Sequence, residues 1–144
     1  MIFNTYSEYA IKLVFNLVEK NGDRSFIRIR EIARELDLSY YLLAKVANKL
    51  INNRILTSTQ GPSGGIRLSL PPSELTIFGI IKHFSNLDDF SKCILGLNEC
   101  NSADPCAIHN EWLRTKEPLI DIFNKPITEL DGMKSLKLGS FHQK

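Results

Sequence analysis

Apolar side chains recur every three or four residues over residues 5–20, which is the pattern of an amphipathic helix. Thr5 and Glu8 have the spacing of a capping box, in which a hydroxyl and a carboxylate each accept a backbone N–H at the start of a helix. Residues 29–36 repeat the helical pattern in a shorter form, and Asp37 and Leu38 then predict a tight turn. The chain therefore begins with a long helix followed by a short one.

A third helix is predicted to begin after Ser39, whose hydroxyl makes it a good N-cap, and to run to about Asn52. Its apolar positions lie on one face, whereas the opposite face is polar and basic. A short helix, a turn of about four residues and a second helix with a polar outer face form a helix-turn-helix pattern. This pattern favours DNA binding, although other small helical bundles show it as well.

A β-hairpin is predicted directly after these helices. Residues 55–60 favour a strand, the Gly-Pro-Ser-Gly-Gly sequence at 61–65 favours a turn, and residues 66–70 alternate between apolar and polar. A hairpin in this place is the wing of a winged helix, whose tip reaches a minor groove while the second helix lies in the major groove. The hairpin therefore strengthens the prediction of a DNA-binding module.

Positive charge is concentrated in the same region. Residues 24–67 carry eight basic and three acidic side chains, a net charge of +5, while the whole chain of 144 residues has a formal net charge of +2. A basic stretch on a nearly neutral chain indicates a polyanionic partner. The composition is that of a globular chain, with neither a membrane span nor a secretory signal. We therefore expect a cytoplasmic protein without a membrane partner.

The C-terminal half is predicted to hold two further helices. Thr76 caps a helix that ends near residues 86–89, and Asp104 caps a second one in which Pro105 takes the first position. Pro118 interrupts the second helix and predicts a kink or a restart. This long helix is too apolar to stand alone, so we expect it to pack on another subunit.

Three cysteines and a histidine gather within seventeen residues, namely Cys93, Cys100, Cys106 and His109. An odd number of cysteines argues against a structural disulfide framework. Cys106 and His109 are expected on one face of the first helical turns, where free backbone N–H groups favour thiolates or an anionic cluster. Three thiols and an imidazole could close one metal site.

Several interpretations of this group are open from the residues alone. An iron–sulfur cluster, which we favour, tolerates long loops between its cysteines. A structural zinc site usually has short Cys-x2–4-Cys knuckles, which the sequence lacks. The cysteines could also be buried or redox-active without a metal. A Cys–His nucleophilic enzyme would need a third, orienting residue, and none is visible.

Two further segments accompany the cysteine group, which runs on to Asn-Glu-Trp112. They are Glu-Ile-Ala-Arg-Glu-Leu-Asp-Leu-Ser at residues 31–39 and Gly-Pro-Ser-Gly-Gly-Ile-Arg-Leu at residues 61–68. Together they resemble the IscR/NsrR-type, or Rrf-two, family of winged helix-turn-helix iron–sulfur transcription regulators. The resemblance covers almost all of residues 6–130.

This resemblance implies a homodimeric DNA-binding transcription regulator, mainly α-helical with a small β-hairpin. It implies a winged helix-turn-helix DNA-binding domain at residues 1–87, a cysteine-containing cluster-binding loop at 88–104 and a long C-terminal dimerisation helix at 105–130. Residues 131–144 contain glycine, lysine and serine without a clear period, so we expect a mobile tail there. The cluster would control operator binding and sense redox state, nitric oxide or iron–sulfur supply. The alternatives are a cluster-free regulator using thiol chemistry or a partner protein, and a small Cys/His enzyme; we expect no enzyme.

The resemblance also implies two choices for the fourth ligand. IscR-like proteins use a histidine, matched here by His109, with a two-iron cluster, whereas NsrR-like proteins use a carboxylate, matched by Glu8, with a four-iron cluster. We favour His109 because the capping box already explains Glu8. The expected metal ligands of a 2Fe–2S cluster, with 4Fe–4S and Glu8 as the alternative, are Cys93, Cys100, Cys106 and His109.

The winged helix predicts a set of side chains on double-stranded DNA, at a two-fold related site because the protein is expected to be a dimer. The family's wing often has an arginine where this chain has Gln60, which cannot supply that charge to a narrow minor groove. Its recognition helix ends in glycine where this chain has Asn53, which we expect to take the left-handed cap. The expected DNA contacts are Arg28, Arg30, Ser39, Tyr40, Tyr41, Lys45, Lys49, Gln60, Ser63 and Arg67.

Overall fold

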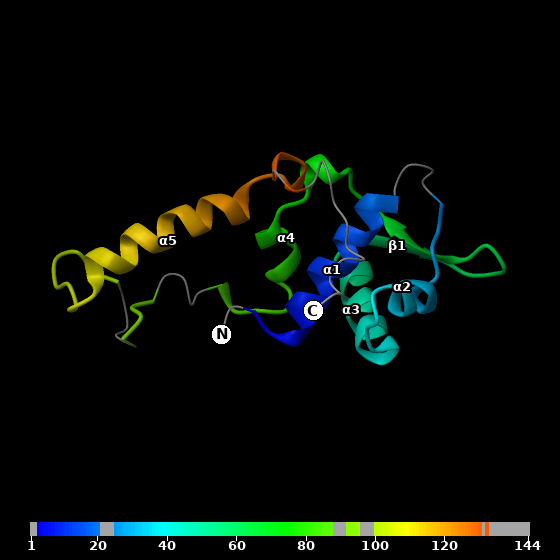
Figure 1. Cartoon of the computed structure of the whole chain (residues 1–144), viewed down its shortest axis with the longest axis horizontal. Helices are drawn as coiled ribbons and strands as arrows, with labels where there is room; N and C mark the ends of the chain where they lie inside the picture. Colours follow the sequence, from blue (N-terminus) through cyan, green and yellow to red (C-terminus); the bar gives the residue numbers. More distant parts are fainter. Residues whose placement is uncertain (1–2, 21–24, 88–91, 96–99, 131, 133–144) are drawn as a thin grey trace.

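The computed structural model describes residues 3–20, 25–87, 92–95, 100–130 and 132 of the chain. The described elements are, in order, α1 (Thr5–Lys20), α2 (Ile29–Glu35), α3 (Tyr40–Asn52), β1 (Leu56–Thr59), β2 (Gly65–Leu68), η1 (Pro72–Glu74), α4 (Ile77–Ile81), α5 (His109–Asn124) and η3 (Ile127–Glu129). Helices α1 to α4 and the hairpin form one body, and α5 extends from it as an arm (Figure 1). The expected mainly helical fold with a small hairpin is confirmed.

The hydrophobic core lies where α1 packs against α3, with α2 and the base of the hairpin closing its sides. The apolar stripe of each helix faces inward because its side chains recur at helical spacing. Burying one such leucine contributes about 1.5–3 kcal/mol relative to exposure. The fully buried side chains of the two central helices are Ala10, Leu13, Val14, Leu43, Val46, Ala47 and Leu50.

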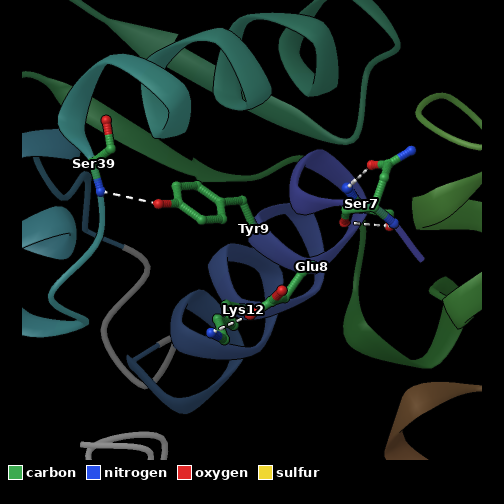
Figure 2. Close-up of polar contacts among 6 residues, drawn as sticks. Ser7, Glu8, Tyr9, Lys12 and Ser39 are labelled. Carbon is green, nitrogen blue, oxygen red and sulfur yellow. Dashed lines mark hydrogen bonds and ion pairs between the residues drawn. The ribbon is translucent and has the colours of Figure 1, made fainter.

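The start of α1 is capped one residue earlier than the sequence predicts. The Asn4 Oδ1 atom accepts the Ser7 backbone N–H at 2.9 Å, and the Ser7 hydroxyl oxygen accepts the Asn4 backbone N–H at 2.9 Å. The capping box is therefore Asn4–Ser7, and the predicted box of Thr5 and Glu8 is wrong. Figure 2 shows the result for Glu8, whose carboxylate instead accepts from Lys12 one turn further along α1, at 2.7 Å.

Helix α3 begins where the sequence predicts. Ser39 is its N-cap and accepts the Leu42 backbone N–H at 3.4 Å, while the Ser39 backbone N–H donates to the Tyr9 hydroxyl at 3.2 Å (Figure 2). At the other end, Arg54 takes the left-handed conformation with φ 62°, and Asn53 has φ −97°. The prediction for Asn53 is therefore wrong. Its side chain instead donates to the Lys49 carbonyl at 2.7 Å.

The predicted hairpin is confirmed as an antiparallel pair of strands. Its register pairs Leu56 with Leu68 and Thr59 with Gly65. Beside the two strands, Ile27 forms an isolated antiparallel bridge with Ile66 of β2. The Ile27 backbone N–H donates to the Ile66 carbonyl at 2.9 Å, and the Ile27 carbonyl accepts the Ile66 N–H at 2.8 Å. The segment before α2 therefore holds the base of the wing.

Helix α4 is shorter than predicted. Thr76 caps it as expected and accepts the Gly79 backbone N–H at 2.9 Å, but the helix ends at Ile81 and turns follow. The Phe84 carbonyl accepts the Asn4 side-chain N–H at 2.8 Å. This bond ties the turns after α4 to the start of α1.

Helix α5 begins at His109, so the predicted start at Pro105 is wrong. Residues 107 and 108 form a turn in which the Cys106 carbonyl accepts the His109 backbone N–H at 3.1 Å. Cys106 therefore lies just before the helix, not within it. The helix continues through Pro118 without a restart, although proline supplies no N–H to the ladder.

The residues after α5 return to the body of the molecule. Ile127 is fully buried in the core and its backbone N–H donates to the Leu75 carbonyl at 2.8 Å. Phe123, at the end of α5, packs edge-on against Phe3 and Phe78, with ring centroids 5.5 and 5.3 Å away. These contacts anchor the C-terminal end of α5, whereas its N-terminal end lies farthest from the hairpin (Figure 1).

Two sequence predictions concern residues whose structure is not described. The expected mobile tail consists of residues 131–144, of which only Gly132 belongs to the described set. The predicted cluster-binding loop at 88–104 is described at 92–95 and 100–104. None of the described helices combines the length and apolar character needed to cross a membrane.

The base of the wing provides a stability test. A Cβ atom at Gly65, where φ is +147°, would lie 2.4 Å from the Ile27 carbonyl, whereas one at Gly61, where φ is +101°, meets nothing within 4 Å. We expect Gly65→Ala to lower the free energy of unfolding by about 2–3 kcal/mol, and Gly61→Ala by about 1 kcal/mol. Urea titrations of both variants measure the difference. Equal costs would show that the contact with Ile27 is unimportant.

Candidate functional site

The outer face of α3 presents the side chains expected for a recognition helix. Tyr41 is 80% exposed and Tyr40 40% exposed, with their rings 5.9 Å apart, and Lys45 is exposed one turn further on. The Arg30 guanidinium lies 4.8 Å from the centre of the Tyr40 ring. The structure therefore brings the predicted residues of α2 and α3 onto one surface.

A groove of about 370 Å³ separates this surface from the wing. Arg28 crosses it, because its guanidinium donates to the Pro62 carbonyl at the wing tip at 2.8 Å. Such a groove, with cationic walls and a glycine-rich edge, admits a phosphate backbone at close approach. The residues lining the groove are Arg28, Ile29, Arg30, Tyr40, Asn48, Ile51, Ser58, Thr59, Gly61, Gly64, Gly65 and Ile66.

Three polar residues that were not among the predicted DNA contacts also line this groove, namely Asn48, Ser58 and Thr59. Asn48 follows Tyr40 and Tyr41 at helical spacing, so the periodicity of α3 was a usable signal. Ser58 and Thr59 belong to β1 and become lining residues only through the packing of the wing on α2 and α3. Their identity carries no such signal in the sequence.

Seven of the ten predicted DNA contacts do not line the groove, namely Ser39, Tyr41, Lys45, Lys49, Gln60, Ser63 and Arg67. The Arg67 guanidinium lies 4.5 Å from the centre of the Phe26 ring and lines a second hollow, of about 490 Å³, on another side of the hairpin. The Lys49 ammonium lies 5.3 Å from the centre of the Phe84 ring, at the far end of α3. Gln60 and Ser63 are exposed at the wing tip.

His83 lies beside the Lys49 end of this face. Burial lowers the pKa of His83 below its usual range, and the positive charges of Lys82 and Lys49 lower it further. The end of α3 that faces α4 is therefore a region of concentrated positive charge.

The cysteine site is organised as two contacting pairs. The Cys93 and Cys106 sulfur atoms lie 3.3 Å apart, and the Cys100 sulfur lies 3.4 Å from His109 Nδ1. The other ring nitrogen of His109, Nε2, lies 3.3 Å from the Ser102 hydroxyl. Cys93 and His109 are only 6% and 4% exposed, so each pair has one buried member. The structure thus gathers the four residues that the sequence picked out.

The two pairs are neighbours. The hydrogen bond with Cys93 raises the pKa of the Cys106 thiol, and a backbone hydrogen bond from Ile108 opposes this effect. Cys100 is close enough to raise the pKa of Cys106 further by charge repulsion. In the part of the chain that the structure describes, no three Cys, His, Asp or Glu side chains are grouped so that they could hold one metal ion. The arrangement is therefore two pairs and not one converged centre.

Glu8 lies apart from this group. It is exposed on α1, in the body of the molecule, whereas the cysteines precede and flank the far end of the α5 arm (Figure 1). Its neighbour within the same helix is Lys12, at 2.7 Å (Figure 2). Within one chain, Glu8 and the cysteines are not brought together.

Trp112 lies one turn after His109 on the same side of α5. Its indole N–H is buried and, among the described residues, has no hydrogen-bond acceptor. A buried donor normally has a partner, so this environment suits an acceptor such as a sulfur atom.

The helix-turn-helix, the wing and the flanking arm define a winged-helix transcription regulator. Residues 3–126 match the model of the Rrf2 family, described as iron-dependent transcriptional regulators. The chain belongs to the Rrf2 family, which is a family of transcriptional regulators and not of enzymes. The alternative of a Cys/His enzyme is thereby excluded.

Individual relatives agree with this assignment. An HTH-type transcriptional regulator of Aquifex aeolicus is 30% identical to this chain over 125 residues, which is 85% of each chain. The HTH-type transcriptional regulator NsrR of Oceanobacillus iheyensis is 30% identical over 113 residues, which is 75% of this chain and 74% of NsrR. CymR, the global cysteine regulator of B. subtilis, shares the fold with a TM-score of 0.69 and 21% identity, over 85% of this chain and 88% of CymR.

The start of α1 provides a test of which residue, Asn4 or Glu8, stabilises the fold as the cap of this helix. We expect Asn4→Ala to lower the free energy of unfolding by about 1 kcal/mol, because it removes the N-cap. Glu8→Gln removes only an exposed ion pair and should change it by less than about 0.5 kcal/mol. Urea unfolding of both variants is the measurement. A larger cost for Glu8→Gln would restore it as the capping residue.

Proposed function

We propose that this chain is a homodimeric regulator whose operator binding is controlled by an iron–sulfur cluster at the start of α5. The observation that carries the proposal is the pair of contacts that places Cys93 against Cys106 and Cys100 against His109, at and just before the start of α5. Thiolates with one histidine are a donor set for iron–sulfur clusters. Membership of a family described as iron-dependent supports the same interpretation.

Operator binding is assigned to α3 and the wing. Helix α3 presents Tyr41 and Lys45 to the major groove, and Arg28 and Arg30 lie beside the groove that separates it from the wing. Because the wing tip is held by Arg28, helix and wing meet the duplex in a fixed relation. The remaining proposed contacts are Ser39, Tyr40, Lys49, Gln60, Ser63 and Arg67.

A second copy of the chain is the proposed partner of α5. The main packing partner of α5 within the chain is α4, at the anchored end. Ile108 and Ile122 remain 38% and 44% exposed along the helix. Burying such side chains against a second α5 contributes to association. A dimer of this kind reads two half-sites about one helical turn, or a multiple of it, apart.

The donor set fits a cluster that takes its ligands in pairs. Cys93 with Cys106 and Cys100 with His109 supply four ligands, and the Ile108 backbone N–H donates to the Cys106 sulfur. A pairwise arrangement suits a two-iron cluster better than a single metal ion. When bound, the cluster supplies an iron centre that reacts with oxidants or nitric oxide.

His109 is the proposed fourth ligand because it already contacts Cys100 and is buried. Glu8 has no capping role, and its carboxylate pairs with Lys12 on α1 at 2.7 Å. However, Glu8 belongs to α1 in the body of the molecule, whereas His109 begins α5 at the far end of the arm (Figure 1), so ligation by Glu8 would need the second copy. If His109 is the fourth ligand, a His109 variant should lose the cluster. If Glu8 is the fourth ligand, a Glu8 variant should lose it.

The role of the α3 face can be tested by salt dependence. Lys45→Ala should weaken operator binding and reduce the slope of log affinity against log salt by about 0.9 for each phosphate that the lysine neutralises, one in each half-site. Lys125→Ala is the matched control, because Lys125 is exposed at the end of α5, away from α3. Fluorescence anisotropy at several salt concentrations is the measurement. Equal slopes in both variants would assign DNA binding to another face.

The cluster can be tested by colour and content. Wild-type protein isolated without oxygen should absorb visible light and contain iron and sulfide, while Cys100→Ala should be colourless. His109→Ala should lose most of the iron and Glu8→Gln should retain it, with His83→Ala as the matched control histidine. Retention by His109→Ala and loss by Glu8→Gln would reverse the ligand assignment. A wild type that takes up neither iron nor sulfide would overturn the cluster.

A further inference from the structure

Cys93 and Cys106 form a close thiol pair that the proposed cluster uses only as two separate ligands. Their sulfur atoms lie 3.3 Å apart, and neither residue is in a disulfide. A disulfide bond is about 2.05 Å long, so small side-chain rotations bring these sulfurs into bonding distance. We propose that the cluster-free chain forms an intrachain disulfide between Cys93 and Cys106, which makes this pair a site of oxidative modification.

The third cysteine is kept out of this reaction by its own partner. The Cys100 sulfur lies 3.4 Å from His109 Nδ1, and the other side of the ring contacts the Ser102 hydroxyl at 3.3 Å. His109 is 4% exposed, so surrounding atoms hold the ring in place. The disulfide therefore joins two specific cysteines of the three and leaves Cys100 as a thiol.

Hydrogen peroxide supplies the oxidant. Cys106 is half-buried and Cys93 is 6% exposed, so peroxide reaches the Cys106 sulfur first. That sulfur attacks one peroxide oxygen, the O–O bond breaks, and the departing hydroxide takes the thiol proton as water, which leaves a sulfenic acid. The Cys93 sulfur then attacks the Cys106 sulfur, the S–O bond breaks, and a second water carries away the Cys93 proton. Each sulfur loses one electron and the peroxide gains two.

The disulfide and the cluster exclude each other, because both use the sulfurs of Cys93 and Cys106. A chain that has lost its cluster under oxidation therefore stays without one until a thiol reductant reopens the bond. This adds a second, slower level of control to the proposed function. The disulfide itself rests on the sulfur geometry and does not require that a cluster ever forms.

The test uses the full-length, cluster-free, reduced protein treated with hydrogen peroxide, after which remaining thiols are alkylated and counted by mass. Wild type should pass from three alkylated cysteines to one. Cleavage after Lys92, Glu99 and Arg114 yields two peptides, one holding Cys93 and the other holding Cys100 and Cys106. These peptides should be joined without reductant and separate with it.

The decisive variants remove one cysteine each. Cys100→Ser should still join the two peptides, at a rate within about twofold of wild type, and leave no alkylated thiol. Cys93→Ser and Cys106→Ser should each lose the joined peptides under the same treatment. Failure of Cys100→Ser to join them, a bond from Cys100 in wild type, or dimers cross-linked between chains would overturn the proposal.

The outcome is separable from that of the proposed function. The thiol count is made on protein without a cluster, so it is unaffected if iron and sulfide never bind. Conversely, suppose that reduced wild type takes up a cluster while peroxide treatment of the cluster-free protein produces no joined peptides. That result would support the cluster and overturn the disulfide. If both hold, oxidised wild type should take up no iron until it is reduced.

Discussion

The burial of the apolar face of α1 against α3 is the contact on which the other parts of the molecule depend. Leu13 and Val14 of α1 are completely shielded from solvent in a core shared with Val46 of α3. The same contact carries a polar link, because the Tyr9 hydroxyl accepts the backbone N–H of Ser39 (Figure 2). Helix α1 thus holds the buried face and the first turn of α3, and through them the direction in which its outer face points.

The elements with strong periodicity could be predicted from the sequence. The bounds of α1 and the start of α3 follow from apolar spacing and from Ser39, and the hairpin follows from its Gly-Pro turn. Errors occurred at the caps and ends of elements. An Asn4–Ser7 box takes the place of the expected box of Thr5 and Glu8, and Asn4 also donates to the Phe84 carbonyl. No local pattern contains the second of these contacts.

The candidate site divides in the same way. Clustering of Cys93, Cys100 and Cys106 near His109 is visible in the sequence, but the pairing of sulfur with sulfur and of sulfur with imidazole is not. Among the predicted DNA contacts, Arg30 lies by the groove, whereas Arg67 packs on Phe26. The guanidinium groups of these arginines pack on aromatic rings from other segments of the chain. Such contacts depend on the folded geometry, so the sequence does not predict them.

The double role of Asn4 also bears on how the protein is handled. Its side chain joins the start of α1 to the Phe84 carbonyl, just before the chain leaves the winged body toward the cysteines. An affinity tag fused ahead of Asn4 is therefore attached beside the point at which the chain turns toward the cysteines. Spectroscopic or binding comparisons made with such a fusion need a version from which the tag has been removed.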